Sequence, residues 1–375
     1  MKNNKVLVLG NPLDHEGGMV VFNRGLIYTL NTSQIKFKLI HFTVGSRTSL
    51  FYYKRLKSLI YPFVLIFDLF LLAFKMNDKN IKIIQSNPSL IPVPLIRDGV
   101  IQILNVFFFK RKSIIVLHGW KEHIYKSIAK SKLLKYLIKS FFNSADTVFV
   151  LSSDFRNKLI KLGINESKIE ITRTFFYDKD ISLSRNLDSN DRIKFIYLGR
   201  VSKLKGIDEL IDAFEIVIKS RNDFECQIIG HGDKHNVEEY FTKKVNDKKL
   251  SEKIKFLGRR DGSEKFSLLK NADIYIFPSY MEGCPTSVIE ALASGLFVIS
   301  TDVGALDDII HDGNGIKIKP KNVNELSKAI IKSMRNIKKI RSIKNQISIE
   351  ARSKYEIKKI SNQFNKVYLK ITDGK

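Results

Sequence analysis

The sequence has few of the residues on which several common architectures depend. Its 375 residues include two cysteines, Cys226 and Cys284, so it offers neither a disulfide framework nor a cysteine metal cluster. No stretch of 18 or more residues is free of charge, and the most apolar candidate, 58–74, is interrupted by Pro62 and Asp68. The sequence therefore predicts no membrane-spanning helix.

Several sequence signatures are also absent. The first residues, Lys-Asn-Asn-Lys at 2–5, lead directly into a short apolar run that is too short for a signal peptide, so we expect a cytoplasmic protein. The three spaced glycines of dinucleotide-binding dehydrogenases do not occur. No zinc-finger, aromatic RNA-binding or basic-zipper pattern is found, and we expect no nucleic-acid partner.

Negative charge is scarce, which leaves a formal net charge of +26. Such a field favours anionic partners: phospholipid surfaces, nucleic acid or phosphorylated substrates. Lysines spread over solvated faces would give the same excess. The region Phe51–Tyr61 interleaves aromatic residues with cations, as interfacial helices do, and predicts peripheral contact with an anionic membrane. A helix packed on its own domain would have the same pattern.

Short apolar runs alternate with helical patterns along the chain, which is typical of a parallel sheet. The chain is long for one core, and a polar stretch at 175–191 is predicted to link two such series. We therefore predict an α/β protein with two Rossmann-like, doubly wound domains facing a cleft, at 1–178 and 190–354. The predicted strands are Lys5–Leu9, Phe37–Phe42, Ile81–Gln85, Ser113–Leu117, Thr147–Leu151, Lys194–Leu198, Glu225–Ile229, Lys253–Leu257, Asp273–Phe277, Leu296–Ser300 and Gly315–Ile318.

One segment of the second series places two carboxylates around the start of a helix. Glu282 lies in the loop after a predicted strand, and Glu290 lies about one and a half turns into a helix that begins at Pro285 and ends before Gly295. Free N–H groups at a helix start attract phosphate, and flanking carboxylates can accept hydrogen bonds from hydroxyls. Phosphate and hydroxyls together describe a nucleotide sugar. The plain alternative is a pair of solvated glutamates.

Further candidates follow predicted strands, where ligands bind in open α/β sheets. Gly17–Gly18 would let a phosphate approach the backbone, and His118 should face the cleft unless it is a core histidine. Gly199–Arg200 and Lys205 place two cations around a turn, an arrangement suited to clamping two phosphates unless both are solvated surface charges. Gly258–Arg260 would line a nucleotide base pocket.

Taken together, these motifs resemble family 4 glycosyltransferases of the GT-B fold, the glycosyl transferases group 1, over nearly the whole chain. The resemblance is carried by Glu-Gly-Gly-Met at 16–19, His118–Gly119, Gly199–Gly206, and the run from Glu282 to Glu290 continued by Ala-Leu-Ala-Ser-Gly and by Thr-Asp-Val-Gly at 301–304. The last two are the most specific. The resemblance implies that the C-terminal helix at 355–375 packs back on the first domain.

The activity that the resemblance implies is a retaining, hexosyltransferase-type transfer from a nucleotide diphosphate sugar to an acceptor hydroxyl, without metal or cofactor. No Asp-x-Asp segment stands in either half where a metal-dependent transferase needs one, and cations take the metal's place. The acceptor is expected to be a carbohydrate or lipid-linked saccharide in bacterial surface polysaccharide synthesis: capsule, O-antigen or exopolysaccharide. Such work would take place on the inner face of the plasma membrane.

The resemblance also implies roles for single residues. Arg200 and Lys205 would bind the diphosphate and stabilise the leaving nucleotide, Glu290 would accept the ribose hydroxyls, and Glu282 would contact the donor sugar. His118 would touch the donor sugar or the acceptor, and it completes the implied catalytic set. The implied donor-binding set is Gly17, Gly18, Gly199, Arg200, Lys205, Gly258, Arg260, Glu282, Gly283, Cys284, Pro285, Thr286 and Glu290.

Two residues depart from the family pattern. Phe297 replaces a common proline at the entry to a strand, and Cys284 stands where an aromatic residue is frequent, which bears on the identity of the donor sugar. Two alternative functions remain at this stage. One is a non-catalytic basic module of the same fold that binds membrane or nucleic acid, and the other is a sugar phosphorylase or epimerase.

Overall fold

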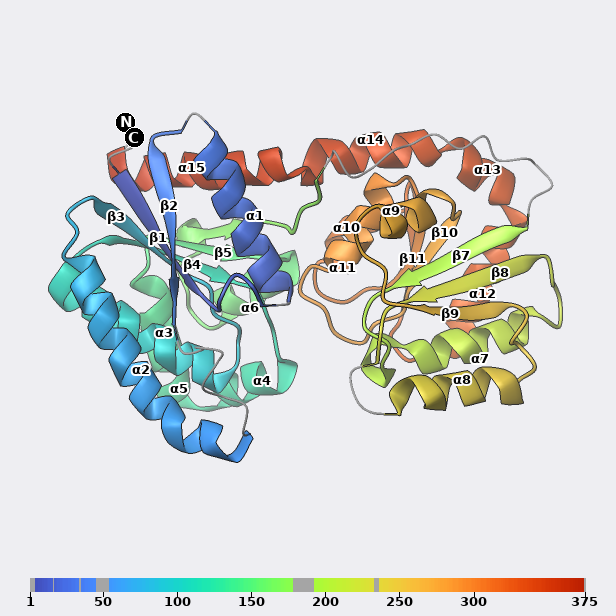
Figure 1. Ribbon diagram of the computed structural model, residues 1–375, viewed down its shortest axis with the longest axis horizontal. Coiled ribbons are helices and arrows are strands. Elements are labelled where there is room, and N and C mark those ends of the chain that lie inside the picture. Colours follow the sequence, from blue (N-terminus) through green and yellow to red (C-terminus); the bar gives the residue numbers. More distant parts are fainter. Residues whose placement is uncertain are drawn as a thin grey trace. The chain divides into compact units, whose positions relative to one another are not determined.

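The computed structural model describes residues 4–15, 17–33, 35–44, 54–177, 192–232 and 236–373, and for 54–62 it describes the backbone alone. The chain divides into two units (Figure 1): unit 1 comprises Met1–Arg173 and Ile357–Lys375, and unit 2 comprises Thr174–Glu356. The side chains of the predicted membrane contact at Phe51–Tyr61 lie outside the described part of the chain, as do Glu16 and most of the predicted linker.

Unit 1 contains a six-stranded sheet in the order β2-β1-β3-β4-β5-β6, with every pairing parallel. Valine, leucine and isoleucine fill the central strands on both faces, as expected of a parallel sheet covered by helices. The strands are β1 (Asn4–Gly10), β2 (Phe37–Thr43), β3 (Ile81–Ser86), β4 (Lys112–Leu117), β5 (Thr147–Val150) and β6 (Ile169–Ile171).

Helices cover both faces of this sheet. Leu72 and Met76 of α2 share a buried cluster with Ile101 of α3 and with Leu7 and Leu9 of β1, so α2 and α3 lie on the same face. Figure 1 shows α4 and α5 on that face as well, while α1 and α15 lie on the other. The helical segments are α1 (Gly18–Thr32), α2 (Lys54–Met76), α3 (Pro92–Leu104), η2 (Asn105–Phe109), α4 (Glu122–Lys130), α5 (Lys132–Asn143), α6 (Ser153–Lys161), η3 (Glu166–Lys168) and α15 (Ile357–Asp373).

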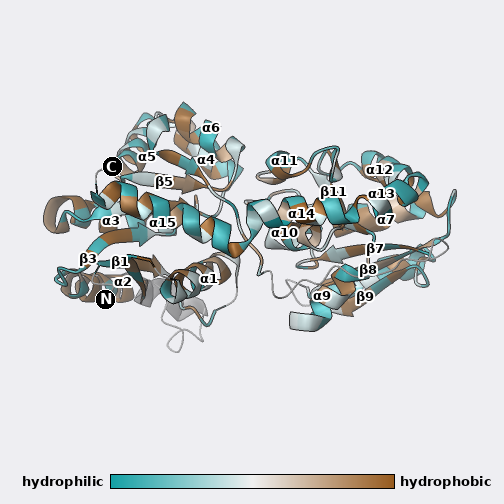
Figure 2. Ribbon diagram, turned by 90° about the horizontal axis from the view of Figure 1, so that it is seen from above, coloured by the Kyte–Doolittle hydropathy of each residue, from teal (hydrophilic) through white to brown (hydrophobic). Residues whose placement is uncertain are grey.

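The C-terminal helix α15 packs in unit 1 although it follows all of unit 2 in sequence. Its buried Phe364 stacks on Phe149 of β5 with 4.2 Å between ring centroids. The hydroxyl of Tyr368 donates to Gln85 Oε1 at 2.7 Å inside the core. Figure 2 shows hydrophobic and hydrophilic residues alternating along this helix, as expected of a helix with one buried side.

Unit 2 repeats the architecture with a parallel sheet in the order β12-β11-β10-β7-β8-β9. In its core Phe214 stacks on Phe224, and Phe195 contacts both rings edge-on. The elements are β7 (Ile193–Leu198), η5 (Lys203–Lys205), α7 (Ile207–Val217), β8 (Phe224–Ile229), α8 (Val237–Asp247), β9 (Ile254–Gly258), α9 (Gly262–Lys270), β10 (Ile274–Phe277), α10 (Thr286–Ala293), β11 (Phe297–Thr301), α11 (Leu306–Ile309), β12 (Gly315–Ile318), α12 (Val323–Arg335), α13 (Ile337–Ser342) and α14 (Lys344–Tyr355).

Two parallel, helix-covered sheets confirm the predicted pair of Rossmann-like domains. Each of the eleven predicted strands is present. The sequence analysis missed β6, whose three residues are too short to show a pattern. The predicted helix start is wrong by one residue: Pro285 has φ −71° and ψ 119°, so it precedes the first helical residue, Thr286.

One helical stretch in the described residues is long and apolar enough to cross a membrane, judged by length and composition. It is Pro92–Phe109, with a mean hydropathy of 1.3 over 18 residues, and 28% of it is buried in the fold. The charged pair Arg97 and Asp98 inside it is buried and joined at 2.6 Å. This stretch differs from 58–74, the most apolar candidate in the sequence.

Candidate donor site in unit 2

Three loops meet at the carboxyl ends of β7, β10 and β11. The backbone N–H of Tyr280, after β10, donates to the Leu204 carbonyl in η5 at 3.0 Å. The Thr301 hydroxyl, at the end of β11, donates to the Ser279 carbonyl at 2.6 Å. These bonds hold the predicted Arg200–Lys205 turn beside the predicted Glu282 loop, at the edge of the sheet where open α/β folds bind ligands.

Within these loops the predicted phosphate-binding cation meets the predicted sugar-binding carboxylate. Lys205 Nζ lies 2.5 Å from Glu282 Oε1, and the two side chains are only 25% and 10% exposed. The same ammonium lies 5.6 Å from the ring centroid of Phe277. A largely desolvated pair of this kind has strong local electrostatics, so an incoming phosphate could exchange with the carboxylate as the partner of Lys205.

The second predicted carboxylate, Glu290, pairs with a cation that the sequence analysis did not select. Lys265 Nζ of α9 lies 2.7 Å from Glu290 Oε1, with exposures of 18% and 13%. The predicted cation on the same connection, Arg260, instead pairs with Glu264 at 2.8 Å. Lys265 lies a little over one helical turn beyond Arg260, and only the direction of α9 shows which cation reaches Glu290.

Arg200 is exposed and directly follows the end of β7 and Gly199. Its side chain has no ion pair among the described residues, while its carbonyl accepts a hydrogen bond from the Tyr197 hydroxyl at 2.7 Å. The Tyr275 hydroxyl donates to the Leu198 carbonyl at 2.8 Å. Burial raises the pKa of both phenols, which stay protonated and fix the backbone that carries Arg200.

The predicted Gly199 and Gly258 lie at the ends of β7 and β9, and Gly230 lies at the end of β8 between them. The Gly199 N–H donates to the Ile229 carbonyl at 3.0 Å, and the Gly230 N–H donates to the Gly258 carbonyl at 2.9 Å. A Cβ on Gly230 would lie 1.8 Å from the Gly199 carbonyl oxygen. Glycine is therefore needed at position 230 so that its backbone can approach that of Gly199. The three glycines contribute backbone, and not side chains, to this part of the site.

The Thr-Asp-Val-Gly motif has a local structural cause. Gly304 has φ 57°, and a Cβ there would lie 2.1 Å from the Glu282 carbonyl oxygen. Next to it, the Ala305 N–H donates to the Gly283 carbonyl at 2.8 Å. The motif therefore packs against the backbone of the Glu282 loop and supports it. Any side chain at Gly304 would displace that loop.

The start of α10 follows this loop. Pro285 has no N–H, and the N–H groups of Gly283, Thr286 and Ser287 have no hydrogen-bond acceptor among the described residues. Such donors, together with the helix dipole, suit an anionic group. Cys284 is 8% exposed, and its sulfur lies 3.5 Å from the Thr174 amide nitrogen. The thiol is therefore packed against unit 2's own backbone.

The remaining predicted site residues belong to unit 1. Asn87 donates from Nδ2 to the Leu9 carbonyl at 2.8 Å, which directs its Oδ1 to His118 Nε2 at 3.0 Å. His118 Nε2 therefore carries the proton, and Nδ1 keeps its lone pair. Burial lowers the pKa of His118 to about 3, so the imidazole is neutral at physiological pH. The sequence analysis missed Asn87, which follows β3 and was identifiable only by that position.

Gly17 and Gly18 form the start of α1. Gly17 is the N-cap with φ 130°, and Gly18 is the first helical residue. A Cβ on either would have no described heavy atom within 4 Å. The backbone at this helix start is therefore exposed, as the prediction of a phosphate contact requires.

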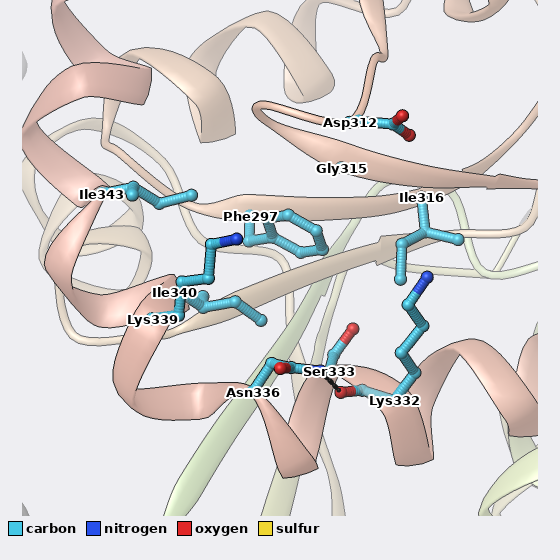
Figure 3. A pocket seen from close by; sticks show the side chains of 10 residues that line it. All are labelled: Phe297, Asp312, Gly315, Ile316, Lys332, Ser333, Asn336, Lys339, Ile340 and Ile343. Carbon is cyan, nitrogen blue, oxygen red and sulfur yellow. Dashed lines mark hydrogen bonds between the residues drawn. The ribbon is translucent and has the colours of Figure 1, made fainter.

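A separate pocket lies at the opposite ends of the strands in unit 2. It has a volume of about 280 Å³ and includes Phe297, Ile340 and Lys339 in its lining (Figure 3). None of the predicted site residues lines it. Phe297, the departure from the family pattern, thus bears on this pocket and not on the candidate donor site. In the described part of the chain, no three His, Cys, Asp or Glu side chains cluster as metal ligands would.

Residues 178–349 match the family model described as Glycosyl transferases group 1. An uncharacterized glycosyltransferase of Methanocaldococcus jannaschii is 28% identical over 61% of this chain and 60% of its own length. The capsular polysaccharide biosynthesis glycosyltransferase CapH of Staphylococcus aureus is 26% identical over 79% of each chain. The alignment with the archaeal protein therefore spans less than two thirds of that relative's length.

Among solved structures, HepE from Anabaena in complex with UDP superposes with a TM-score of 0.73 at 17% identity, over 97% of this chain and 99% of HepE. At this identity the likeness concerns the fold, and it confirms the GT-B class for a chain with two parallel six-stranded sheets. With the family match over residues 178–349, the second half of the chain is similar to the group 1 glycosyltransferases.

Proposed function

We propose that the protein moves a sugar from a nucleotide diphosphate sugar to an acceptor hydroxyl, with retention of anomeric configuration, as hexosyltransferases of family 4 do. The proposal rests on one observation above all: Lys205, on the turn that begins with Arg200, pairs with Glu282 at the carboxyl ends of β7 and β10. Cations in this position would neutralise the diphosphate, so the proposal includes neither a metal nor a cofactor.

Binding would exchange the partners of these side chains. The diphosphate takes Arg200 and Lys205, and the N–H groups at the start of α10 add donors for the same anion. Glu282, released from Lys205, accepts hydrogen bonds from the sugar hydroxyls, while Glu290 accepts those of the ribose. As the glycosidic phosphate departs, its developing charge is stabilised by groups that are already in position.

His118 is assigned a hydrogen-bonding role. With a pKa of about 3 it is too weak a base to take a proton from a hydroxyl near neutral pH, but its Nδ1 can accept a hydrogen bond from a sugar or acceptor hydroxyl. The proton of the acceptor hydroxyl goes to the departing phosphate oxygen.

We assign the acceptor to a lipid-linked saccharide of bacterial surface polysaccharide synthesis, met by a cytoplasmic protein at the inner face of the plasma membrane. Support comes from CapH, which is named for capsular polysaccharide biosynthesis, and from the net charge of +26. HepE was solved with UDP, so uridine diphosphate sugars are the first donors to test.

The test is sugar incorporation into a membrane acceptor fraction, with a panel of labelled nucleotide sugars. Arg200→Ala/Lys205→Ala should reduce kcat/KM by at least 100-fold, because each preorganised charge contributes about 3 kcal/mol to the transition state. Lys203→Ala is the matched control, since the Lys203 ammonium lies 4.5 Å from the ring centroid of Tyr240. Equal incorporation by the double variant and the wild type, with every donor, would sink the proposal.

A further inference from the structure

Unit 1 exposes an unusual amount of apolar surface on α2, α3, η2 and α5. Of the exposed large apolar side chains in the described residues, five lie on α2, four on α3, three on η2 and four on α5, against six elsewhere. Phe63, Phe70 and Phe74 are 70–76% exposed, and Phe107 and Phe108 are 69% and 73% exposed. Soluble monomers rarely leave so many neighbouring aromatic side chains in water, which marks an interaction surface.

These side chains belong to one face of the unit, here named the apolar face. The cluster that contains Leu72, Met76 and Ile101 anchors α2 and α3 to the same side of the sheet. Figures 1 and 2 show α3 lying between α2 and α5, in agreement with the order of the strands that they connect. The face is therefore continuous across at least three helices.

The charges on this face are of one sign. The only carboxylates within α2, α3, η2 and α5 are Asp68 and Asp98, and both are fully buried. Exposed lysines border the apolar residues, among them Lys132 and Lys139 on α5. Aromatic residues flanked by cations, with no exposed anion, complement a surface of acyl chains beneath anionic headgroups.

The segment Pro92–Phe109 lies along the sheet and does not cross a bilayer. It connects β3 to β4, which pair directly with Ile84 opposite Ser113, and Ile101 is buried under the sheet. A spanning helix could not keep these contacts. A second copy of the chain would be a less suitable partner for the apolar face, because two such faces would bring like charges together.

We propose that the apolar face docks on an anionic phospholipid bilayer, with the phenylalanines of α2 and η2 entering the headgroup and acyl boundary. The functional role of this docking rests on the proposed function, because a lipid-linked acceptor would lie at that boundary. Vesicle binding without nucleotide sugar tests docking separately from transfer.

The experiment is flotation of the full-length protein with phosphatidylglycerol/phosphatidylcholine vesicles and with pure phosphatidylcholine vesicles. We expect binding that requires phosphatidylglycerol, and a loss of about tenfold or more for Phe70→Ser/Phe107→Ser. Tyr28→Ser is the control, because Tyr28 is 65% exposed on α1, on the other face of the sheet. Lys132→Gln/Lys139→Gln should lose about fivefold per lysine at low salt, and the exposed pair Lys328→Gln/Lys338→Gln should not.

Variants are compared only after circular dichroism and thermal melting show that they fold as the wild type does. Absence of binding to phosphatidylglycerol vesicles overturns the proposal, as does equal binding by Phe70→Ser/Phe107→Ser and Tyr28→Ser. Sedimentation that shows a dimer abolished by Phe70→Ser/Phe107→Ser, without vesicle binding, would assign the face to self-association. If docking fails while soluble acceptors are still glycosylated, the proposed function stands and the docking surface does not.

Discussion

At the scale of single residues, the candidate donor site consists of opposite charges that already satisfy one another. Lys205 pairs with Glu282, and Lys265 pairs with Glu290, all four side chains being at most 25% exposed. Removing one member of such a pair leaves a largely desolvated charge without its partner. Stability and ligand binding are therefore coupled at these positions.

Lys265→Met should lower the free energy of unfolding by about 1–3 kcal/mol, because Glu290 then remains desolvated without a cation. Glu290→Gln should cost less when Lys265 is already replaced, so a double-mutant cycle measured by urea unfolding gives a favourable coupling energy. Additive losses in the free energy of unfolding would show that Lys265 and Glu290 have no coupling energy. Lys243→Met, at an exposed lysine without a described ion pair, is the control.

Gly304→Ala adds only a methyl group, but we expect it to destabilise the protein strongly. The new Cβ would lie 2.1 Å from the Glu282 carbonyl oxygen, and the backbone has φ 57°. We expect a loss of at least about 2 kcal/mol in unfolding free energy together with loss of nucleotide binding. Gly99→Ala is the matched control, because Gly99 lies within α3 with no atom near its Cβ position. Equal thermal stability of the two variants would contradict the expectation.

His118 predicts a pH dependence of stability. Its pKa is about 3 in the folded protein and about 6.5 in an unfolded chain, so the unfolded state binds more protons between these values. Stability is therefore lost as the pH falls below about 6.5 and is unaffected above it. From pH 7 to pH 5, the wild type should lose about 1–2 kcal/mol more than His118→Gln in urea unfolding. Equal losses would show that His118 is not held neutral.

At the scale of elements, α15 is the part of unit 1 whose place depends on aromatic packing. Phe364 is fully buried, 4.2 Å from Phe149 and 5.7 Å from Phe22 between ring centroids. Phe364→Ala should cost about 3–5 kcal/mol in unit 1, measured by the exchange protection of its amides. Lys366→Ala, at an exposed position on the same helix, should change little. Similar protection in the two variants would mean that α15 does not support the unit.

The helices and strands that could be predicted are those marked by a local sequence pattern. Apolar runs bounded by turn residues identified the strands, and Gly295 identified the end of α10 because its φ of 80° favours glycine. The three-residue β6 carries no such run. The cation beside Glu290 and the amide beside His118 were missed for a different reason. Lys265 and Asn87 acquire their roles only when separate strand ends converge, and a single sequence does not show that convergence.

At the scale of the whole molecule, each unit has its own sheet and core, while the charged residues predicted to bind the donor all belong to one of them. Arg200, Lys205, Glu282 and Glu290 all belong to unit 2, whereas the exposed apolar surface belongs to unit 1. Donor binding and bilayer docking are therefore assigned to different units and can be measured independently.

This separation gives a prediction for uridine diphosphate in the absence of acceptor and membrane. At about 100 times its Kd the nucleotide stabilises the state that binds it by about 2.7 kcal/mol, so amide exchange should slow in unit 2, most strongly at 199–206 and 282–290. Arg200→Ala/Lys205→Ala should lose this protection, and Lys203→Ala should keep it. Protection confined to the segments of unit 1, or retained in the double variant, would place the nucleotide elsewhere. Because the charged partners of the diphosphate all come from unit 2, its protection should not depend on vesicles.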